Sequence, residues 1–355
     1  MKPVERSITL LLAFVALVQA CTSDKGVVGP RASTRLTADA AEEQPQYGSW
    51  SAPVNLGPVI NTAANEQHPA ISKDGLSLYI SSDRPGGFGG TDIWVSQRAC
   101  TDADDAACAW QTPANLGSNI NSAGNDLAPT FTPDGHQLYF HSTGRGGCGL
   151  ADIFLGRRHD KRDDFGWEAA ENLGCVVNSS YADAGPTYFE DEATGVTTLY
   201  FTVQNNPPTS DQGFDIYAST RIGDEGAFGP PVIRRDGLEI FLSSGRPGDD
   251  VVGRSAGSED LWVSTRATTS DVWSPPVNLN LVNQQLGGPP INSAAFDGAP
   301  ALYFDGTTLY FFSERPGGFG KRDLYVTTRA RLGGPDVAED AGVETHHNGQ
   351  GHGKE

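Results

Sequence analysis

The sequence predicts an all-β fold, a β-propeller of five four-stranded blades, and three observations support this class. The chain of 355 residues holds 43 glycines and 23 prolines, which favours many turns and few long helices. The pattern Asp-[Ile/Leu]-aromatic-x-x-x-Arg occurs five times. An Asp-Gly pair, a strong hairpin signal between apolar runs, stands before an apolar strand in four units. One such unit cannot bury both faces of its sheet, whereas five units arranged radially cover one another.

Each repeated unit predicts four short strands. One follows the opening aromatic residue, one follows a proline, one is of the type Leu-Tyr-Ile-Ser-Ser, and one carries the Asp-to-Arg pattern. The units make up a predicted propeller domain over residues 48–329. They run over residues 50–98, 110–158, 167–221, 228–266 and 273–329.

The repeats also carry the motifs Trp-x-x-Pro-x-Asn-Leu, Ser-x-Arg-Pro-Gly-Gly and Asp-Ile-Trp-Val. These motifs resemble the WD-repeat-like β-propeller repeats of the TolB type in bacterial envelope proteins, and the resemblance covers residues 50–329. It implies that the sequence repeat is offset from the blade by one strand, so that the strand after Trp50 completes the last blade and closes the ring. The fourth unit lacks a stretch that the others have, so the third blade is expected to lack part or all of its outer strand.

The N-terminal 20 residues read as an export signal. Lys2 and Arg6 precede an apolar run, Ile8–Ala20, which has the length of a secretory signal and is too short to span a bilayer. The segment from Val18 to Cys21 resembles the bacterial lipobox, which implies removal of residues 1–20 and lipid attachment at Cys21. The alternative is an ordinary signal peptide in which this cysteine has no role.

The remaining non-repeated segments lack periodicity. Residues 21–47 are predicted to be a flexible tether and residues 330–355 a disordered tail. Threonine at position 22 resembles the pattern of lipoproteins exported to the outer membrane, so we expect a lipid-anchored protein there, on its periplasmic or surface side. The formal charge of −19 argues against binding to nucleic acid or to anionic lipid, so membrane contact is expected through the anchor alone.

The other four cysteines are predicted to form two disulfides. Cys100 and Cys108 lie eight residues apart in one loop, and strand alternation places the loops of Cys148 and Cys175 next to each other. Such pairs are typical of an oxidising compartment, and Cys-x-x-Cys metal spacing is absent from the sequence.

A carboxylate precedes the inner-strand proline by three residues in four of the units. On a propeller these side chains are expected near one mouth of the central channel, where they are candidates for binding a ligand. One interpretation is an open ring for calcium, and the other is that each carboxylate accepts hydrogen bonds from its own loop. The four candidates are Glu66, Asp126, Asp183 and Asp297.

The sequence favours a non-catalytic protein-interaction scaffold of the cell envelope and not an enzyme. The channel carboxylates are copies in register, whereas an active site needs unique groups, and the histidines are expected in unrelated places. No cofactor is expected, and the partner is expected to be an envelope protein or a peptidoglycan-associated component. Two alternatives remain, a carbohydrate-binding or glycoside-processing propeller and a calcium-stabilised binding module. Aromatic and acidic residues that break the repeat and face the channel would favour the carbohydrate alternative.

Overall fold

The computed structural model describes residues 46–102, 105–191, 196–204, 214–222, 237–245, 259–269 and 271–332. These residues belong to one compact unit that begins at Pro45. The predicted signal peptide, Cys21 and nearly all of the predicted tether lie outside the described residues, as do residues 333–355 of the predicted tail. In the described part of the chain, no helix combines the length and the hydropathy needed to cross a membrane.

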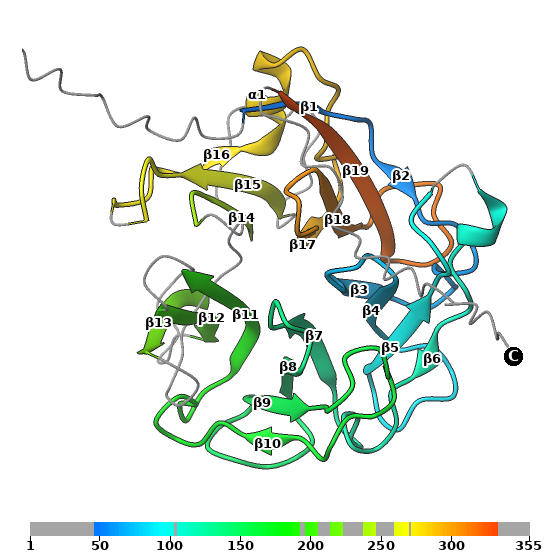
Figure 1. Cartoon of the computed structure of the whole chain (residues 1–355), viewed down its shortest axis with the longest axis vertical. Coiled ribbons are helices and arrows are strands. Elements are labelled where there is room, and N and C mark those ends of the chain that lie inside the picture. The colour runs from blue at the N-terminus through cyan, green and yellow to red at the C-terminus, as the bar shows by residue number, and fades with distance from the viewer. Residues whose placement is uncertain are drawn as a thin grey trace, which may run out of the picture. The chain divides into compact units, whose positions relative to one another are not determined.

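Five antiparallel sheets confirm the predicted β-propeller (Figure 1). In the inner parts of the blades, β3 contacts both β17 and β7, β7 contacts β11, and β14 contacts β17. Blade 1 contains β3 (Glu66–Ile71), β4 (Ser77–Ser82), β5 (Asp92–Gln97) and β6 (Ala114–Asn115). Blade 2 contains β7 (Asp126–Phe131), β8 (Gln137–Ser142), β9 (Asp152–Arg157) and β10 (Glu171–Asn172).

Blades 3 and 4 each have three strands among the described residues. The missing segment of the fourth unit accounts for blade 3, which has no fourth strand there, and the predicted inner strand of blade 4 lies outside the described residues. Blade 3 contains β11 (Asp183–Asp191), β12 (Val196–Gln204) and β13 (Phe214–Ile222). Blade 4 contains β14 (Glu239–Ser244), β15 (Asp260–Thr265) and β16 (Val277–Asn278).

Blade 5 closes the ring in the predicted way. The N-terminal β2 (Val54–Asn55) pairs with the C-terminal β19 (Asp323–Leu332), and β1 (Gln46–Trp50) pairs with the same strand further along. The other two strands of the blade are β17 (Asp297–Leu302) and β18 (Thr308–Ser313). Two short helices lie between strands, η1 (Ala106–Cys108) and α1 (Leu279–Gln285). The sequence predicted the closure through β2, and β1 adds a second pairing.

In four of the repeats, the closing arginine joins the Asp-Gly turn of its own unit to the tryptophan that opens a neighbouring unit. In blade 1, Nε of Arg98 donates to the carbonyl of Gly75 at 2.7 Å, and its guanidinium lies 4.4 Å from the ring centre of Trp110. A cation over an aromatic face contributes about 0.5–2 kcal/mol. Three further arginines repeat both contacts: Arg158, Arg266 and Arg329.

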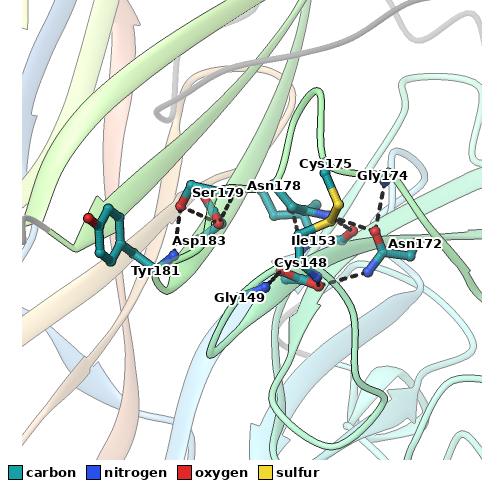
Figure 2. The surroundings of a disulfide bond; sticks show 11 residues. Cys148, Gly149, Ile153, Asn172, Gly174, Cys175, Asn178, Ser179, Tyr181 and Asp183 are labelled. Atoms are coloured by element: carbon teal, nitrogen blue, oxygen red, sulfur yellow. Dashed lines mark hydrogen bonds between the residues drawn. A yellow bond between two sulfur atoms is a disulfide. The ribbon is translucent and has the colours of Figure 1, made fainter.

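A buried asparagine in the loop between two blades forms hydrogen bonds with the backbone of the first blade, as a neighbouring strand would. The side chain of Asn121 accepts from the N–H of Ile93 and donates to its carbonyl, at 2.8 and 2.9 Å. Asn178 makes the same pair of hydrogen bonds with Ile153, as Figure 2 shows. The asparagine side chain satisfies both the N–H and the carbonyl of its partner residue. The blades can therefore join without continuous sheet pairing.

A carboxylate outside the repeat pattern joins blades 1 and 2. Asp164 accepts hydrogen bonds from Ser77 Oγ at 2.6 Å, Tyr79 Oη at 2.9 Å, Gln97 Nε2 at 2.7 Å and Arg158 Nη1 at 2.9 Å. The side chains of Asp164 and Arg158 are each 2% exposed. Such a buried pair is costly to break, because removing one partner leaves the other charge uncompensated.

Candidate functional site

Each of the four predicted channel carboxylates is buried and begins an inner strand. Asp126 accepts from the backbone N–H and the hydroxyl of Ser122 at 2.6 and 2.8 Å, and Asp183 accepts from Ser179 in the same way (Figure 2). Glu66 and Asp297 make equivalent contacts with the residues four positions earlier. The carboxylates therefore hold the loops that enter their own blades, and none of the four lines the central cavity.

Arginines complete these loop contacts. Arg84 donates to Glu66 at 3.1 Å, Arg315 donates to Asp297 at 2.8 Å, and Arg145 lies 3.6 Å from Asp126. The repeat pattern predicts that these three arginines and Arg246 pair with the aspartate that opens the following strand. This is wrong for the three, and Arg246 lies outside the described residues. In blade 2 this aspartate is Asp152, which accepts hydrogen bonds from backbone N–H groups of its turn and from Asn172 of the outer strand.

The pKa of Asp183 is raised, because its burial and the neighbouring Asp152 outweigh the two hydrogen bonds from Ser179, which lower it. Calcium binding at the four carboxylates stays a prediction. Among the described residues, one group of three potential metal ligands clusters closely, and two of its members are joined in a disulfide.

Both predicted disulfides are confirmed. Cys100 and Cys108 join within the loop between β5 and β6. Cys148, in the turn between β8 and β9, joins Cys175 in the loop after β10 (Figure 2).

The central cavity has a volume of about 1140 Å³ and is lined by inner strands of the blades. Prolines at one repeated position contribute to this lining in four blades, namely Pro69, Pro129, Pro186 and Pro300. These copies give the cavity a repetitive, uncharged wall. Any selective chemistry must therefore come from residues that differ between blades.

Two histidines break the repeat and line this cavity. The residue two positions after the inner-strand carboxylate has positive φ in four blades, at His68, Ala128, Gly185 and Ala299. The neighbouring β8 carries His141 where β4 carries Ser81. The rings of His68 and His141 lie 6.4 Å apart between centres. Burial lowers the pKa of His68 to about 3 and that of His141 to about 4, so both rings are neutral at neutral pH.

Two charged residues break the repeat at a second position, the one before the aspartate that opens the third strand. The backbone carbonyl of the residue at this position accepts a hydrogen bond from the first N–H of the next inner strand. This shared contact identifies four equivalent residues, namely Thr91, Ala151, Glu259 and Arg322. Of these, the charged pair lines the cavity and the other two do not. Burial raises the pKa of Glu259, and the charge of Arg322 opposes this.

Aromatic rings support Arg322. Its guanidinium lies 4.8 Å from the ring centre of Phe312 and 5.3 Å from that of Phe296. It also donates to Glu314 at 3.0 Å and to Gln67 at 2.5 Å. Phe296 occupies a position held by asparagine in blades 1 and 2, and Phe312 occupies that of Ser81 and His141. Both rings are therefore departures from the repeat that line the cavity.

The sequence analysis missed this cluster. It expected the histidines in unrelated places, and that is wrong for His68 and His141, because the bulge in β3 and the middle strand of blade 2 face the same cavity. The signal was available in the repeats. Aligning the units on their inner-strand carboxylates and on the aspartates that open their third strands leaves six unmatched residues, namely His68, His141, Phe296, Glu259, Phe312 and Arg322.

Comparisons with solved structures show the same fold. An α-L-arabinofuranosidase from Podospora anserina, solved with cellotriose, has 13% sequence identity and a TM-score of 0.50 over 81% of this chain and 98% of that chain. A GH62 hydrolase solved with xylotriose has 12% identity and a TM-score of 0.50 over the same shares. A putative TolB from Agrobacterium tumefaciens has 16% identity over 77% of this chain and 80% of that chain, and its TM-score of 0.40 supports no argument. No family model and no curated protein matches the sequence.

These similarities correct two expectations. The sequence analysis expected a non-catalytic interaction scaffold and not an enzyme, whereas propellers that share this fold over most of the chain are glycoside hydrolases. The physical reason is the cavity. The in-register carboxylates lie outside the cavity, whereas residues that break the repeat line it.

Proposed function

We propose that this propeller binds a saccharide in its central cavity and processes a glycosidic bond there. The observation that carries the proposal is the gathering of unmatched aromatic and polar side chains along the cavity. Phe312 and Phe296 also pack against a core cluster, but the equivalent positions of other blades hold small or polar residues, so the repeat itself does not require these rings. A ligand that binds in one orientation needs contacts that are not repeated around the ring. A carbohydrate site on a repeated fold therefore requires side chains that differ between the blades.

The chemistry of the cluster suits a polyhydroxylated, uncharged ligand. A neutral imidazole carries one donor and one acceptor, and so complements a hydroxyl group. Aromatic side chains provide apolar surface of the kind that lines ligand pockets, with a few polar groups that fix orientation. The positive charge of Arg322 is balanced locally by Glu314 at 3.0 Å, so the site is not built to attract an anion.

Glu259 is the proposed proton donor. Burial raises its pKa, which favours the protonated form that a general acid needs at the leaving oxygen of a glycoside. Glu190 also lines the cavity, but it lies at the other end of β11 from Asp183, whereas the carbonyl of Glu259 bonds to the first residue of β17. These two carboxylates therefore stand at opposite ends of the inner strands.

The proposal is tested by replacing Glu259 with glutamine. Hydrolysis of an aryl α-L-arabinofuranoside, xylotriose and cellotriose is measured together with binding by calorimetry. We expect Glu259→Gln to lower turnover about 10²–10⁴-fold while binding persists, because general acid catalysis contributes rate factors of this size. Glu171→Gln is the matched control, since that side chain is 72% exposed on β10. Wild-type protein that neither binds nor cleaves these sugars would overturn the proposal.

The proposal also includes an envelope location. The lipobox-like segment and the TolB-type motifs support a protein anchored to the outer membrane through Cys21, and the two disulfides fit an oxidising compartment. Contact with a peptidoglycan-associated component remains part of this prediction. Cys21→Ser is expected to release the protein from membranes in cell fractionation.

A further inference from the structure

His141 serves an inter-blade contact that fixes where its proton sits. In blades 2 and 5, the N–H of the positive-φ residue donates to a serine hydroxyl of the preceding blade, from Ala128 to Ser81 at 3.1 Å and from Ala299 to Ser243 at 3.0 Å. In blade 3, the N–H of Gly185 donates to Nδ1 of His141 at 3.3 Å. A backbone N–H only donates, so Nδ1 accepts and the proton of the neutral ring is on Nε2.

Nε2–H of His141 is therefore a fixed donor beside the cavity. No hydrogen-bond partner for it is found in the described part of the chain, and the ring lines the cavity. A metal ion is a poor partner for this ring, because coordination needs a free lone pair. The lone pair on Nδ1 is engaged, and Nε2 carries the proton.

His68 has no such constraint. Its Nδ1 is buried without a hydrogen-bond partner in the described structure. At its own blade junction, the position that holds a serine or His141 elsewhere holds Phe312, whose ring centre is 6.3 Å from that of His68. Since no protein group fixes the proton of this ring, a ligand can determine it.

The fixed donor of His141 requires an accepting atom and so excludes an ammonium group, which can only donate. A hydroxyl accepts from His141 and can donate to His68, and because both rings are neutral they offer no positive charge to a carboxylate. We propose that His68 and His141 form a specificity subsite that recognises one hydroxyl group of the bound saccharide. This inference rests on the proposed function and identifies the residues that recognise the sugar.

The test uses variants that restore the repeat. His141→Ser introduces the residue found at Ser81 and Ser243, which keeps an acceptor for the N–H of Gly185. His68→Ala introduces the residue that holds the same positive φ at Ala128 and Ala299. His159→Ala is the control, because that side chain is 99% exposed.

Binding of xylotriose, cellotriose and monodeoxy derivatives of the better ligand is measured by calorimetry. In wild-type protein we expect removal of one particular hydroxyl to weaken binding about 10-fold, as loss of a hydrogen bond with an unpaired buried group does. In both variants that deoxy derivative should bind as well as the parent sugar. Nitrogen-detected NMR should show His141 protonated at Nε2.

The outcomes separate the two proposals. If wild-type protein binds a sugar but the variants keep the same affinity and the same discrimination, the subsite is wrong and the proposed function stands. A His141 protonated at Nδ1 would also overturn the subsite. If no sugar binds the wild-type protein, both fail.

Discussion

The replacement of His141 by serine makes a prediction about stability that follows from burial alone. The ring is 9% exposed, and its pKa is lowered to about 4 from an ordinary value of 6.5. Serine keeps the inter-blade acceptor, as Ser81 and Ser243 do, and removes the titrating group. The variant therefore isolates the titration of this ring.

The sign of the effect follows from proton binding. Between pH 6.5 and about 4, the unfolded chain carries a protonated histidine at this position while the folded protein keeps it neutral. The unfolded state binds more protons in that window, so the free energy of unfolding falls as the pH is lowered through it. The gap between the two pKa values corresponds to about 3 kcal/mol, because one pKa unit is worth about 1.4 kcal/mol.

Urea denaturation of wild-type protein and His141→Ser at several values between pH 7 and pH 4 measures the effect. Carboxylates titrate in the same range in both proteins, so the informative quantity is the difference between them. We expect this difference to move in favour of the variant by up to about 3 kcal/mol as the pH falls. Parallel pH profiles would refute the reasoning, since they would mean that water in the cavity solvates the protonated ring. His159→Ala should give the wild-type profile.

Three further predictions concern the scaffold and are checked by denaturation. Asp164→Ala should lower the free energy of unfolding by about 3–5 kcal/mol, because it leaves a buried arginine unpaired. Replacing the Cys148–Cys175 bridge by serines should cost about 3.5 kcal/mol, and replacing the Cys100–Cys108 bridge about 2.5 kcal/mol, because the sequence separations are 27 and 8; equal costs would contradict the chain-entropy account. Millimolar calcium should leave the melting temperature unchanged if the inner-strand carboxylates are occupied by their own loops, and a rise would revive the calcium hypothesis.

The sequence predicted the architecture well because each blade of a propeller is encoded by a similar stretch of sequence. The Asp-Gly turns predicted a recurring hairpin, and the arginine at a fixed distance from the aspartate of its strand predicted a repeated unit. The structure supplies the reason for the arginine, which binds the turn carbonyl and stacks on the next tryptophan. Closure of the ring was also predicted, because the resemblance to TolB-type repeats implies that the sequence repeat is offset from the blade by one strand. The disulfides followed from which loops share a blade edge.

The candidate site was not predicted, because repeat analysis keeps what recurs and sets aside what differs. His68 aligns with Ala128 and Glu259 aligns with Thr91, and neither difference suggests chemistry until the bulged inner strand is known to face the cavity. The pairing of Arg84 failed for a related reason. Sequence spacing suggests Asp92 as its partner, but Oδ2 of that aspartate accepts from the N–H of Phe88 and from Asn115, while Arg84 donates to the inner-strand carboxylate of Glu66 at 3.1 Å.

Backbone strain at the cavity wall separates scaffold from site. A positive φ at a residue other than glycine is costly, and at His68, where φ is 49°, it would ordinarily suggest a functional constraint. Ala128 and Ala299 adopt the same conformation with φ of 53° and 48° and carry no reactive side chain. The strain therefore belongs to the bulge that lets each inner strand bond to the preceding blade, and every blade with an inner strand in the described residues carries it. His68 is distinguished by its side chain, which the scaffold does not require. In the proposed site this side chain contacts a ligand in the cavity.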